Sequence, residues 1–205
     1  KSDFFDWGGQ KIYVSRTGYT NELGYELYCP SDINHKALWD HLMKCGAQYG
    51  MEFSSTRAMT MRRIEGGIRE NLVDMDTSVN PYDVGLGQFV NLDKENFIGK
   101  SSLINSNKEN KLFGVICKKT VPEVHAKITK SREEIGKITS GVFSPTLKCG
   151  IGFLRLNSPL KIIGEEVQMI MSDDSIENCE VVDLPFFDQE KKIARGLDTT
   201  IPDVS

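Results

Sequence analysis

The sequence has little cysteine or histidine, and neither is spaced for metal binding. Its 205 residues include five cysteines and three histidines, with no Cys-x-x-Cys pair and no Cys/His cluster. Zinc and iron–sulfur sites are therefore not expected. The cysteines are widely spaced in apolar patterns, so we expect all of them to be buried, reduced thiols. They are Cys29, Cys45, Cys117, Cys149 and Cys179.

Long apolar runs and an excess of basic residues are also missing. No run approaches a membrane span, and no basic-then-apolar leader opens the chain. The net charge is −4, which gives no basic footprint for nucleic acid. We therefore expect neither nucleic acid nor membrane as a partner, and a cytoplasmic location, or the mitochondrial matrix in a eukaryote. The first residue is Lys1, so we expect a processed product or a fragment.

Common catalytic motifs are absent as well. Gly85-Leu86-Gly87 lacks the third glycine of a dinucleotide loop, and no G-x-S-x-G elbow or Ser/His/Asp triad is recognisable. Asp74 and Asp76 stand two residues apart in a predicted loop. We expect this acidic pair to be solvated.

The most informative segment present is SRTGYTNELGYE, residues 15–26. Alternating runs precede and follow it, which predicts two strands joined by a glycine-containing turn. In the second strand Glu26 and Tyr28 share one face. A carboxylate can accept two parallel N–H bonds from an aminopyrimidine edge while aromatic rings lie against its face. The pattern alone leaves two interpretations open: a wall for a nitrogen-rich ligand, or an ordinary hairpin with solvated charges.

The remaining pattern predicts an α+β fold class. Strands alternate with helices at the start of the chain, where Ser31 or Asp32 would cap the first helix and Ser54 or Ser55 the second. Later runs are short and strand-like, separated by Gly, Pro, Asn or Asp, as in a small antiparallel β-barrel. The predicted strands are 10–16, 25–30, 111–118, 137–143, 150–156, 165–171 and 177–184, and the main helices are 34–49 and 55–64.

We predict four parts of the chain. Residues 1–98 form an α+β domain, 99–110 a linker with a short helix, 111–187 the antiparallel β-barrel domain, and 188–205 a tail. The tail has few large apolar residues, so we expect it to wrap the surface or to be partly disordered.

Five collinear motifs resemble the glycine-cleavage T-protein (aminomethyltransferase) superfamily. The segment 15–26 resembles SRTGYTGExGxE, and RRIEGG at 62–67 resembles LRLEAG. NPYDVGLGQFV at 80–90 resembles P-x-E-x-G-L-x-W-x-V, and NFIGK at 96–100 matches FIGK. SGVFSPTLKCGIGFLRL at 140–156 resembles G-x-x-SPxLxxxIgla. The resemblance implies the carboxy-terminal part of a folate-binding α+β domain, followed by the small antiparallel β-barrel.

The resemblance implies which residues of this chain form the binding site. Glu26 matches the glutamate that pairs with the pterin ring, and Glu22 matches the earlier motif glutamate that could orient the turn. Tyr19 and Tyr25 could pack against ligand or core. Arg16, just before the turn, could pair with Glu22 or with a substrate carboxylate.

Two arginines and one glutamine complete the predicted site. Arg63 matches the family arginine and could pair with Glu65, reach an anionic folate tail, or simply lie on a solvated helix end. Arg57 is a weaker candidate for the folate tail, because it is out of register with the family pattern. Gln88 stands where the family has tryptophan, and this variant is closer to tetrahydrofolate-dependent demethylases such as dimethylsulfoniopropionate demethylase.

The function that the resemblance implies is one-carbon transfer to tetrahydrofolate. A small-molecule donor would pass on a methyl or methylene group, and a true T-protein would have a lipoyl carrier protein as partner. The family's catalytic aspartate lies in the amino-terminal half, before the region matched here. We therefore assign no catalytic residue and expect the chain alone to be inactive.

Two alternatives stay open. The chain could be the carboxy-terminal folate domain of a flavin-linked dimethylglycine or sarcosine dehydrogenase. It could also be a non-catalytic folate-binding regulatory relative, although KENFIGK at 94–100 stands where such relatives carry a cysteine-containing motif.

Overall fold

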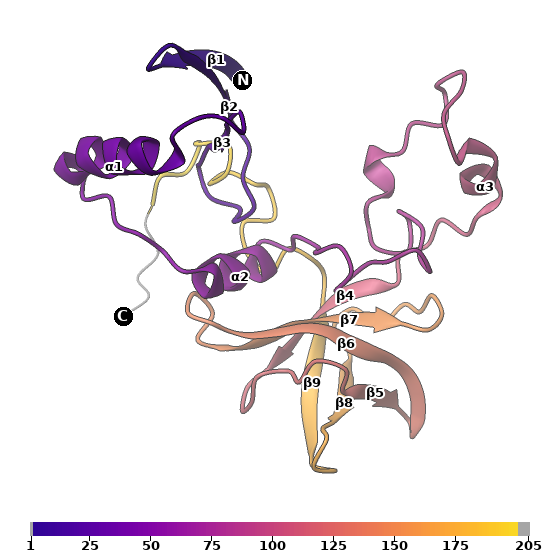
Figure 1. Cartoon of the computed structure of the whole chain (residues 1–205). Coiled ribbons are helices and arrows are strands. Elements are labelled where there is room, and N and C mark those ends of the chain that lie inside the picture. The colour runs from indigo at the N-terminus through magenta and orange to yellow at the C-terminus, as the bar shows by residue number, and fades with distance from the viewer. Residues whose placement is uncertain (1, 201–205) are drawn as a thin grey trace. The chain divides into compact units, whose positions relative to one another are not determined.

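A computed structural model describes residues 2–200 of the chain (Figure 1). These residues form two compact units. We call residues 2–62 with 191–200 the sheet unit, and residues 63–190 the barrel unit. The domain boundaries predicted from the sequence, at 98 and 111, stay a prediction, because compactness alone does not define a domain.

The sheet unit contains three antiparallel strands in the order β1-β2-β3 (Figure 1). They are β1 (Ser2–Trp7), β2 (Gln10–Ser15) and β3 (Glu26–Tyr28). The sequence prediction missed β1. It is joined to β2 by Gly8-Gly9, both with positive φ, between the paired residues Trp7 and Gln10. Two-residue hairpin loops of this twist need positive φ at both positions, which glycine adopts without strain.

One face of this sheet is covered by α1 (His35–Gly46), which continues into η1 (Ala47–Tyr49). Ile12 of β2, Ile33 and Leu38 of α1 form the buried cluster between them. The predicted apolar stripe is therefore correct. The predicted cap is wrong. The side chain of Asn34 accepts from the backbone N–H of Ala37 at 3.0 Å, because the helix begins at His35, three residues after the start that a Ser31 cap would give and two after the start from Asp32.

The next helix, α2 (Thr56–Glu65), forms as predicted. Ser55 caps it, since its hydroxyl accepts from the N–H of Ala58 at 3.2 Å. Gly67 follows the helix with φ of 67° and lies against Pro185, where an added Cβ would come within 3.0 Å of backbone. A short α3 (Lys100–Asn105) and a single turn, η2 (Gly87–Phe89), lie within the barrel unit.

The barrel unit contains a closed antiparallel barrel with strand order β4-β7-β6-β5-β8-β9 (Figure 1). The alternation of apolar residues predicted this barrel, and the structure confirms it. Only β5 was missed, because its four residues, KITK, offer too short a pattern. The strands are β4 (Leu112–Cys117), β5 (Lys127–Lys130), β6 (Glu133–Ser144), β7 (Cys149–Leu156), β8 (Glu166–Ile170) and β9 (Ile176–Val182).

The predicted tail is described only as far as residue 200, and its residues 201–205 lie outside the described part. Its described end belongs to the sheet unit, where the guanidinium of Arg16 donates two hydrogen bonds to the carbonyl of Ala194, at 3.2 and 3.3 Å. Between residues 2 and 200, no helix combines the length and apolar character needed to cross a membrane.

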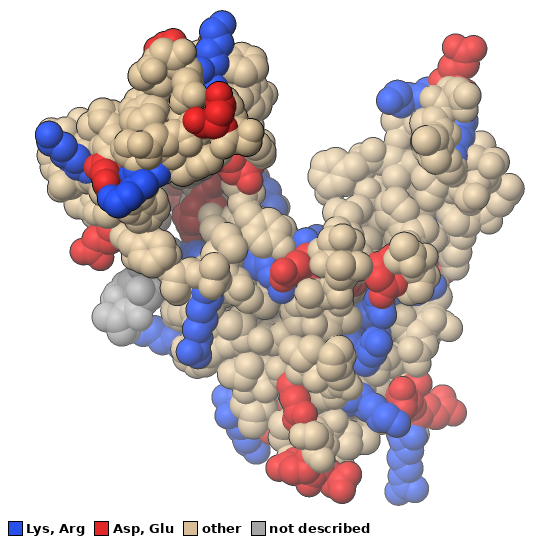
Figure 2. Space-filling view, viewed as in Figure 1, with Lys and Arg blue, Asp and Glu red and all other residues tan. Residues whose placement is uncertain are grey.

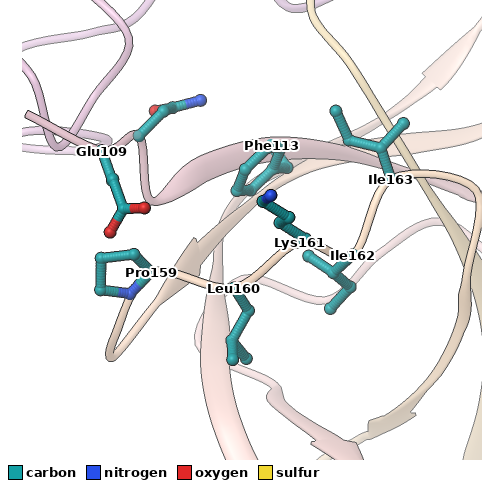
Figure 3. A pocket seen from close by; sticks show the side chains of 8 residues that line it. Glu109, Phe113, Pro159, Leu160, Lys161, Ile162 and Ile163 are labelled. Carbon is teal, nitrogen blue, oxygen red and sulfur yellow. The ribbon is translucent and has the colours of Figure 1, made fainter.

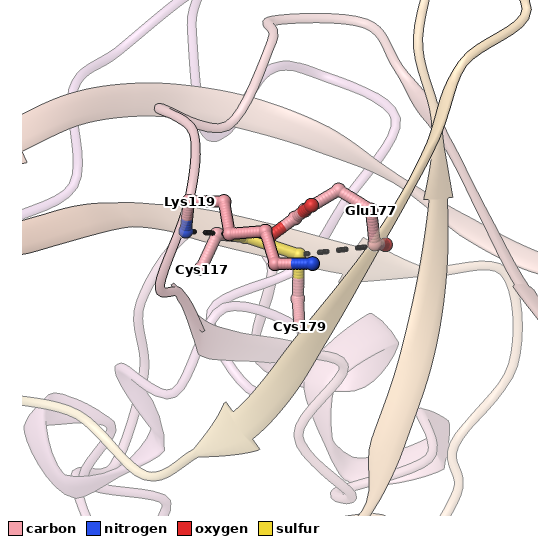
Figure 4. The surroundings of a disulfide bond; sticks show 4 residues. All are labelled: Cys117, Lys119, Glu177 and Cys179. Carbon is pink, nitrogen blue, oxygen red and sulfur yellow. Dashed lines mark hydrogen bonds between the residues drawn. A yellow bond between two sulfur atoms is a disulfide. The ribbon is translucent and has the colours of Figure 1, made fainter.

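The expectation of five buried, reduced thiols is wrong in two ways: two cysteines are joined in a disulfide, and of the other three Cys45 is exposed and Cys29 and Cys149 are only partly buried. Cys117 of β4 and Cys179 of β9 form a disulfide (Figure 4). They are direct partners in the β4–β9 register, with Cα atoms 4.6 Å apart, and opposite side chains on antiparallel strands come close enough to bond. Beside them, the backbone N–H of Lys119 donates to Glu177 Oε1 at 3.3 Å. Cys29, Cys45 and Cys149 are free thiols, and partial burial raises the pKa of Cys149.

The expectation of a solvated acidic pair is wrong for Asp74. Its side chain is fully buried and binds the equally buried Arg63 at 2.8 Å. The hydroxyls of Thr139 and Ser140, both on β6, donate to Asp74 Oδ1 at 2.7 and 2.6 Å. Asp76 does stay half-exposed, 3.2 Å from the guanidinium of Arg155. This buried pair therefore links the end of α2 and the loop after it to the barrel wall.

The disulfide predicts the thiol count of the protein. Denatured without reductant, the chain should react with a thiol reagent at three cysteines, and with reductant at five, because only Cys117 and Cys179 are joined. Ellman titration and intact mass, lower by two hydrogens before reduction, check this. Five reactive thiols before reduction would show that the bond is absent.

The buried pair predicts a large stability effect at Asp74. Asp74→Ala should lower the free energy of unfolding by about 3–5 kcal/mol, because it leaves the guanidinium of Arg63 buried without its main counter-charge. Urea unfolding followed by circular dichroism measures the change. Asp76→Ala is the matched control, two residues away and partly solvated, and it should shift the midpoint little. Equal shifts for the two variants would contradict the assignment.

Candidate functional site

The candidate site is centred on Glu26, at the start of β3 in the sheet unit. The register pairs Glu26 with Ser15 and Tyr28 with Tyr13, so Glu26 and Tyr28 share a sheet face as the alternation predicted. The phenol of Tyr28 donates to Glu26 Oε2 at 3.1 Å, and the hydroxyl of Thr17 donates to the same oxygen. The hydrogen bond to this carboxylate raises the pKa of Tyr28 above its ordinary value.

The second oxygen of the Glu26 carboxylate remains available. Both hydrogen bonds from Thr17 and Tyr28 go to Oε2, and among residues 2–200 none is seen to donate to Oε1. The residue is half-buried. Thr17 and Tyr28 therefore hold the carboxylate in place by one oxygen, and Oε1 keeps its capacity to accept a hydrogen bond.

Glu22 has a different partner from the one considered for it. Its carboxylate forms an ion pair with Arg62 of α2, so the expected partner Arg16 is wrong. The guanidinium of Arg16 instead binds the carbonyl of Ala194 and lies 5.5 Å from the ring centre of Tyr25. Glu22 is thus engaged in tying the turn to the helix.

The two predicted tyrosines of the turn differ in exposure. Tyr19 is half-buried. Tyr25 is 64% exposed and lines a cavity of about 360 Å³ with Phe5 and Val14, which point to the other face of the sheet from Glu26. The structure therefore groups Glu26 with Thr17, Tyr28 and Tyr13, and not with Tyr25.

Arg63 is not on a solvated helix end, and it does not pair with Glu65. Its side chain is only 3% exposed and binds Asp74 and Glu70, each at 2.8 Å. Glu65 is also buried and accepts from the hydroxyl of Ser144 at 2.5 Å. The predicted Arg57 lies at the exposed start of α2.

Gln88 lies in the barrel unit, exposed on the turn η2. The following Phe89 is 76% exposed, and the ring of Tyr82 packs against Gly87 so closely that an added Cβ would meet it at 2.5 Å. The position that carries tryptophan in the family pattern therefore presents an amide here, beside an exposed aromatic ring.

Sequence reasoning missed Thr17 and Tyr13 as neighbours of Glu26. Thr17 stands nine residues from Glu26 in the sequence, so only the turn geometry brings the two together. The signal for Tyr13 was available, because it shares the alternation of β2 and stands opposite Tyr28.

A cavity of about 430 Å³ lies on the barrel unit (Figure 3). Its lining is mostly apolar, with Lys161 and Glu109 as its charged groups. None of the predicted site residues lines it, so we do not assign it to folate.

Charge gives no support to a nucleic-acid surface. Figure 2 shows lysines and arginines interspersed with aspartates and glutamates over the visible face. In the described part of the chain, no group of three or more potential ligands is placed to hold a metal ion.

Family models match both parts of the chain. Residues 1–94 match the GCVT N-terminal domain, and residues 110–188 match the glycine cleavage T-protein C-terminal barrel domain.

Individual relatives agree with these matches. The chain is 32% identical over 188 residues to an aminomethyltransferase of Caldanaerobacter subterraneus, covering 90% of this chain and 50% of that protein. It is 36% identical over 182 residues to an aminomethyltransferase of Halothermothrix orenii, covering 87% and 50%.

A solved structure shares the fold. It is the glycine cleavage system aminomethyltransferase T from Bartonella henselae, with a TM-score of 0.77 at 24% identity, covering 87% of this chain and 50% of the other. The chain thus spans about half the length of the relatives it matches. Two family domains in order, a closed six-strand barrel and relatives above 30% identity lead to one conclusion: the chain belongs to the glycine cleavage T-protein family, and it corresponds to the carboxy-terminal half of the family.

Proposed function

We propose that this chain supplies the pterin-binding wall of a tetrahydrofolate-dependent one-carbon transferase. The observation that carries the proposal is the Glu26 carboxylate, which is held through Oε2 by Thr17 and Tyr28 and keeps Oε1 available. The aminopyrimidine edge of a pterin presents two adjacent N–H donors, and a carboxylate is the acceptor that matches them. The residues present therefore fit the ligand.

The aromatic residues beside Glu26 extend this wall. The rings of Tyr13 and Tyr28 have their centres 5.9 Å apart on the same sheet face as the carboxylate. A flat heterocycle bound at Glu26 would lie beside them and gain apolar contact. Tyr28 has two roles in the proposal: it orients the carboxylate and offers part of the surface.

The protein's own part in the reaction is binding and orientation. Bound tetrahydrofolate would supply the nitrogen nucleophile that accepts the one-carbon unit. Glu26 would fix the far end of the pterin, so that proximity and orientation lower the barrier. We assign Glu22 and Arg63 to positioning, because each is already paired, with Arg62 and with Asp74 and Glu70.

The aminomethyl group is the first candidate for the transferred unit, delivered on a lipoyl carrier protein. The two relatives described above are named aminomethyltransferases, which supports this donor. A demethylase acting on a small methylated compound is the second candidate, and Gln88 favours it, because the exposed amide replaces the family tryptophan. Turnover of the full-length protein with each donor distinguishes the two.

Glu26→Gln should weaken tetrahydrofolate binding by about 1–3 kcal/mol, because the amide loses a charge-assisted acceptor. Calorimetric titration of the 205-residue chain measures this. Glu52→Gln, at an exposed position in the same unit, is the matched control and should leave the affinity unchanged. Equal affinities for wild type and Glu26→Gln would reject the pterin contact.

The isolated 205-residue chain should not catalyse one-carbon transfer to tetrahydrofolate. The resemblance implies that the family's catalytic aspartate lies in the amino-terminal half, and we assign no counterpart in this chain. We expect weak folate binding and no one-carbon transfer above the uncatalysed rate, measured as methylated or methylene tetrahydrofolate by mass spectrometry. A rate typical of a competent enzyme, about 1 per second or more, would contradict this.

A further inference from the structure

The cavity on the barrel unit (Figure 3) is lined by two stretches of chain, one within residues 109–113 and one at residues 159–163. The first leads into β4, and the second is part of the loop between β7 and β8. The cavity volume of about 430 Å³ lies within the range of small-molecule pockets, about 300–1,000 Å³. Both stretches belong to the barrel unit, so the cavity lies within one compact unit.

The buried part of the lining is apolar and belongs to the barrel core. Phe113 of β4 is 7% exposed and Ile162 is 2% exposed, and both are members of the buried cluster inside the barrel. Two further apolar side chains of the lining remain accessible, because Leu160 is 43% exposed and Ile163 55% exposed. An apolar group in the cavity would cover this surface, and covering apolar surface is a main source of affinity in small-molecule sites.

The walls of the cavity are held in place by hydrogen bonds within the barrel unit. The N–H of Asn157 donates to a carbonyl of β6 and the N–H of Gly164 to a carbonyl of β9, each at 2.8 Å, so the loop between β7 and β8 is fixed at both ends. The side chain of Asn110 donates to the carbonyl of Leu112 at 2.7 Å and accepts from its N–H at 3.0 Å. A preformed site loses little conformational entropy when a ligand binds.

The two charged groups of the lining have opposite signs and are not paired with each other. Lys161 makes no ion pair or side-chain hydrogen bond among residues 2–200. The carboxylate of Glu109 accepts only from the amide of Asn107, at 3.3 Å. Figure 3 shows the ammonium and the carboxylate as separate groups of the lining. Both side chains therefore keep their capacity to bind a charged ligand.

We propose that this cavity binds a zwitterionic amino acid with an apolar side chain. The ligand carboxylate pairs with Lys161, its ammonium pairs with Glu109, and its side chain lies against Phe113 and the apolar residues of the loop. An anion would be repelled by Glu109 and a cation by Lys161, so a ligand with both charges complements the lining. The inference does not depend on folate binding, because Glu26 belongs to the sheet unit.

Titration with L-phenylalanine tests the site. Binding to the 205-residue chain is followed by proton–nitrogen NMR. We expect shift changes at residues 109–113 and 159–163, and a dissociation constant of about 1 mM or lower, as for a ligand of this size. L-Alanine carries the same charges without the ring and should bind about tenfold or more weakly. If L-phenylalanine gave no saturable shift changes at these residues up to about 20 mM, the proposal would be overturned.

Two analogues of L-phenylalanine test the charges one at a time. Hydrocinnamate lacks the ammonium and phenethylamine lacks the carboxylate, and each should bind about threefold or more weakly than the amino acid, as for the loss of a partly exposed ion pair. Glu109→Gln should remove the preference over hydrocinnamate, and Lys161→Met the preference over phenethylamine. An analogue that binds the unchanged chain as tightly as L-phenylalanine would overturn the assignment to a zwitterion.

Glu133→Gln and Lys137→Met are the matched controls. Both residues are exposed on β6 in the same unit, and neither lines this cavity. Because the same charges are removed outside the cavity, both preferences should stay as in the unchanged chain. Loss of the preferences in the controls as well would show a general effect of charge and overturn the assignment to the cavity. All the substituted side chains are exposed, so circular dichroism should show each variant folded.

Discussion

One buried ion pair holds the loop after α2 against the barrel wall. Arg63 stands at the end of α2 and Asp74 in the loop after it, and both are almost fully shielded from water. Two charges in such a place are tolerated only with good geometry and with the remaining hydrogen-bonding capacity satisfied. The hydroxyls of Thr139 and Ser140 on β6 satisfy Asp74 Oδ1, whereas the buried Nε of Arg63 has no hydrogen-bond partner among the described residues. The loop therefore cannot leave the barrel wall without exposing a charge pair and stranding two hydroxyls.

Local patterns predicted most of the fold, and non-local contacts explain most of the errors. Alternation is a property of neighbouring residues, so the longer barrel strands and the stripe of α1 were visible in the sequence. The burial of Asp74 depends on a partner 11 residues before it and on hydroxyls 65 and 66 residues after it. The disulfide joins residues 62 apart through strand register. A pattern read over a few consecutive residues cannot predict pairings between residues so far apart in the sequence.

For the candidate site too, local patterns predicted some features, and non-local contacts decided the others. The face shared by Glu26 and Tyr28 followed from alternation alone, whereas the choice of Glu26 among the carboxylates came from the family motif. The sequence could not show that Glu22 would be taken by Arg62, which stands 40 residues away on a helix. The motif predicted that Glu22 could orient the turn, with Arg16 as one possible partner, and only the structure shows that the partner is Arg62. Sequence therefore names candidate groups, and three-dimensional pairing decides which of them remain free to bind.

The ring of barrel strands has a consequence for the ends of the domain. Its first strand, β4, and its last, β9, are hydrogen-bonded neighbours and are bonded covalently through Cys117 and Cys179. Termini that lie side by side can be spliced, and new ones opened at an exposed turn such as Ser131-Arg132 between β5 and β6. The barrel should therefore fold after circular permutation. Its shape would then depend on which strands are neighbours, more than on which strand comes first in the chain.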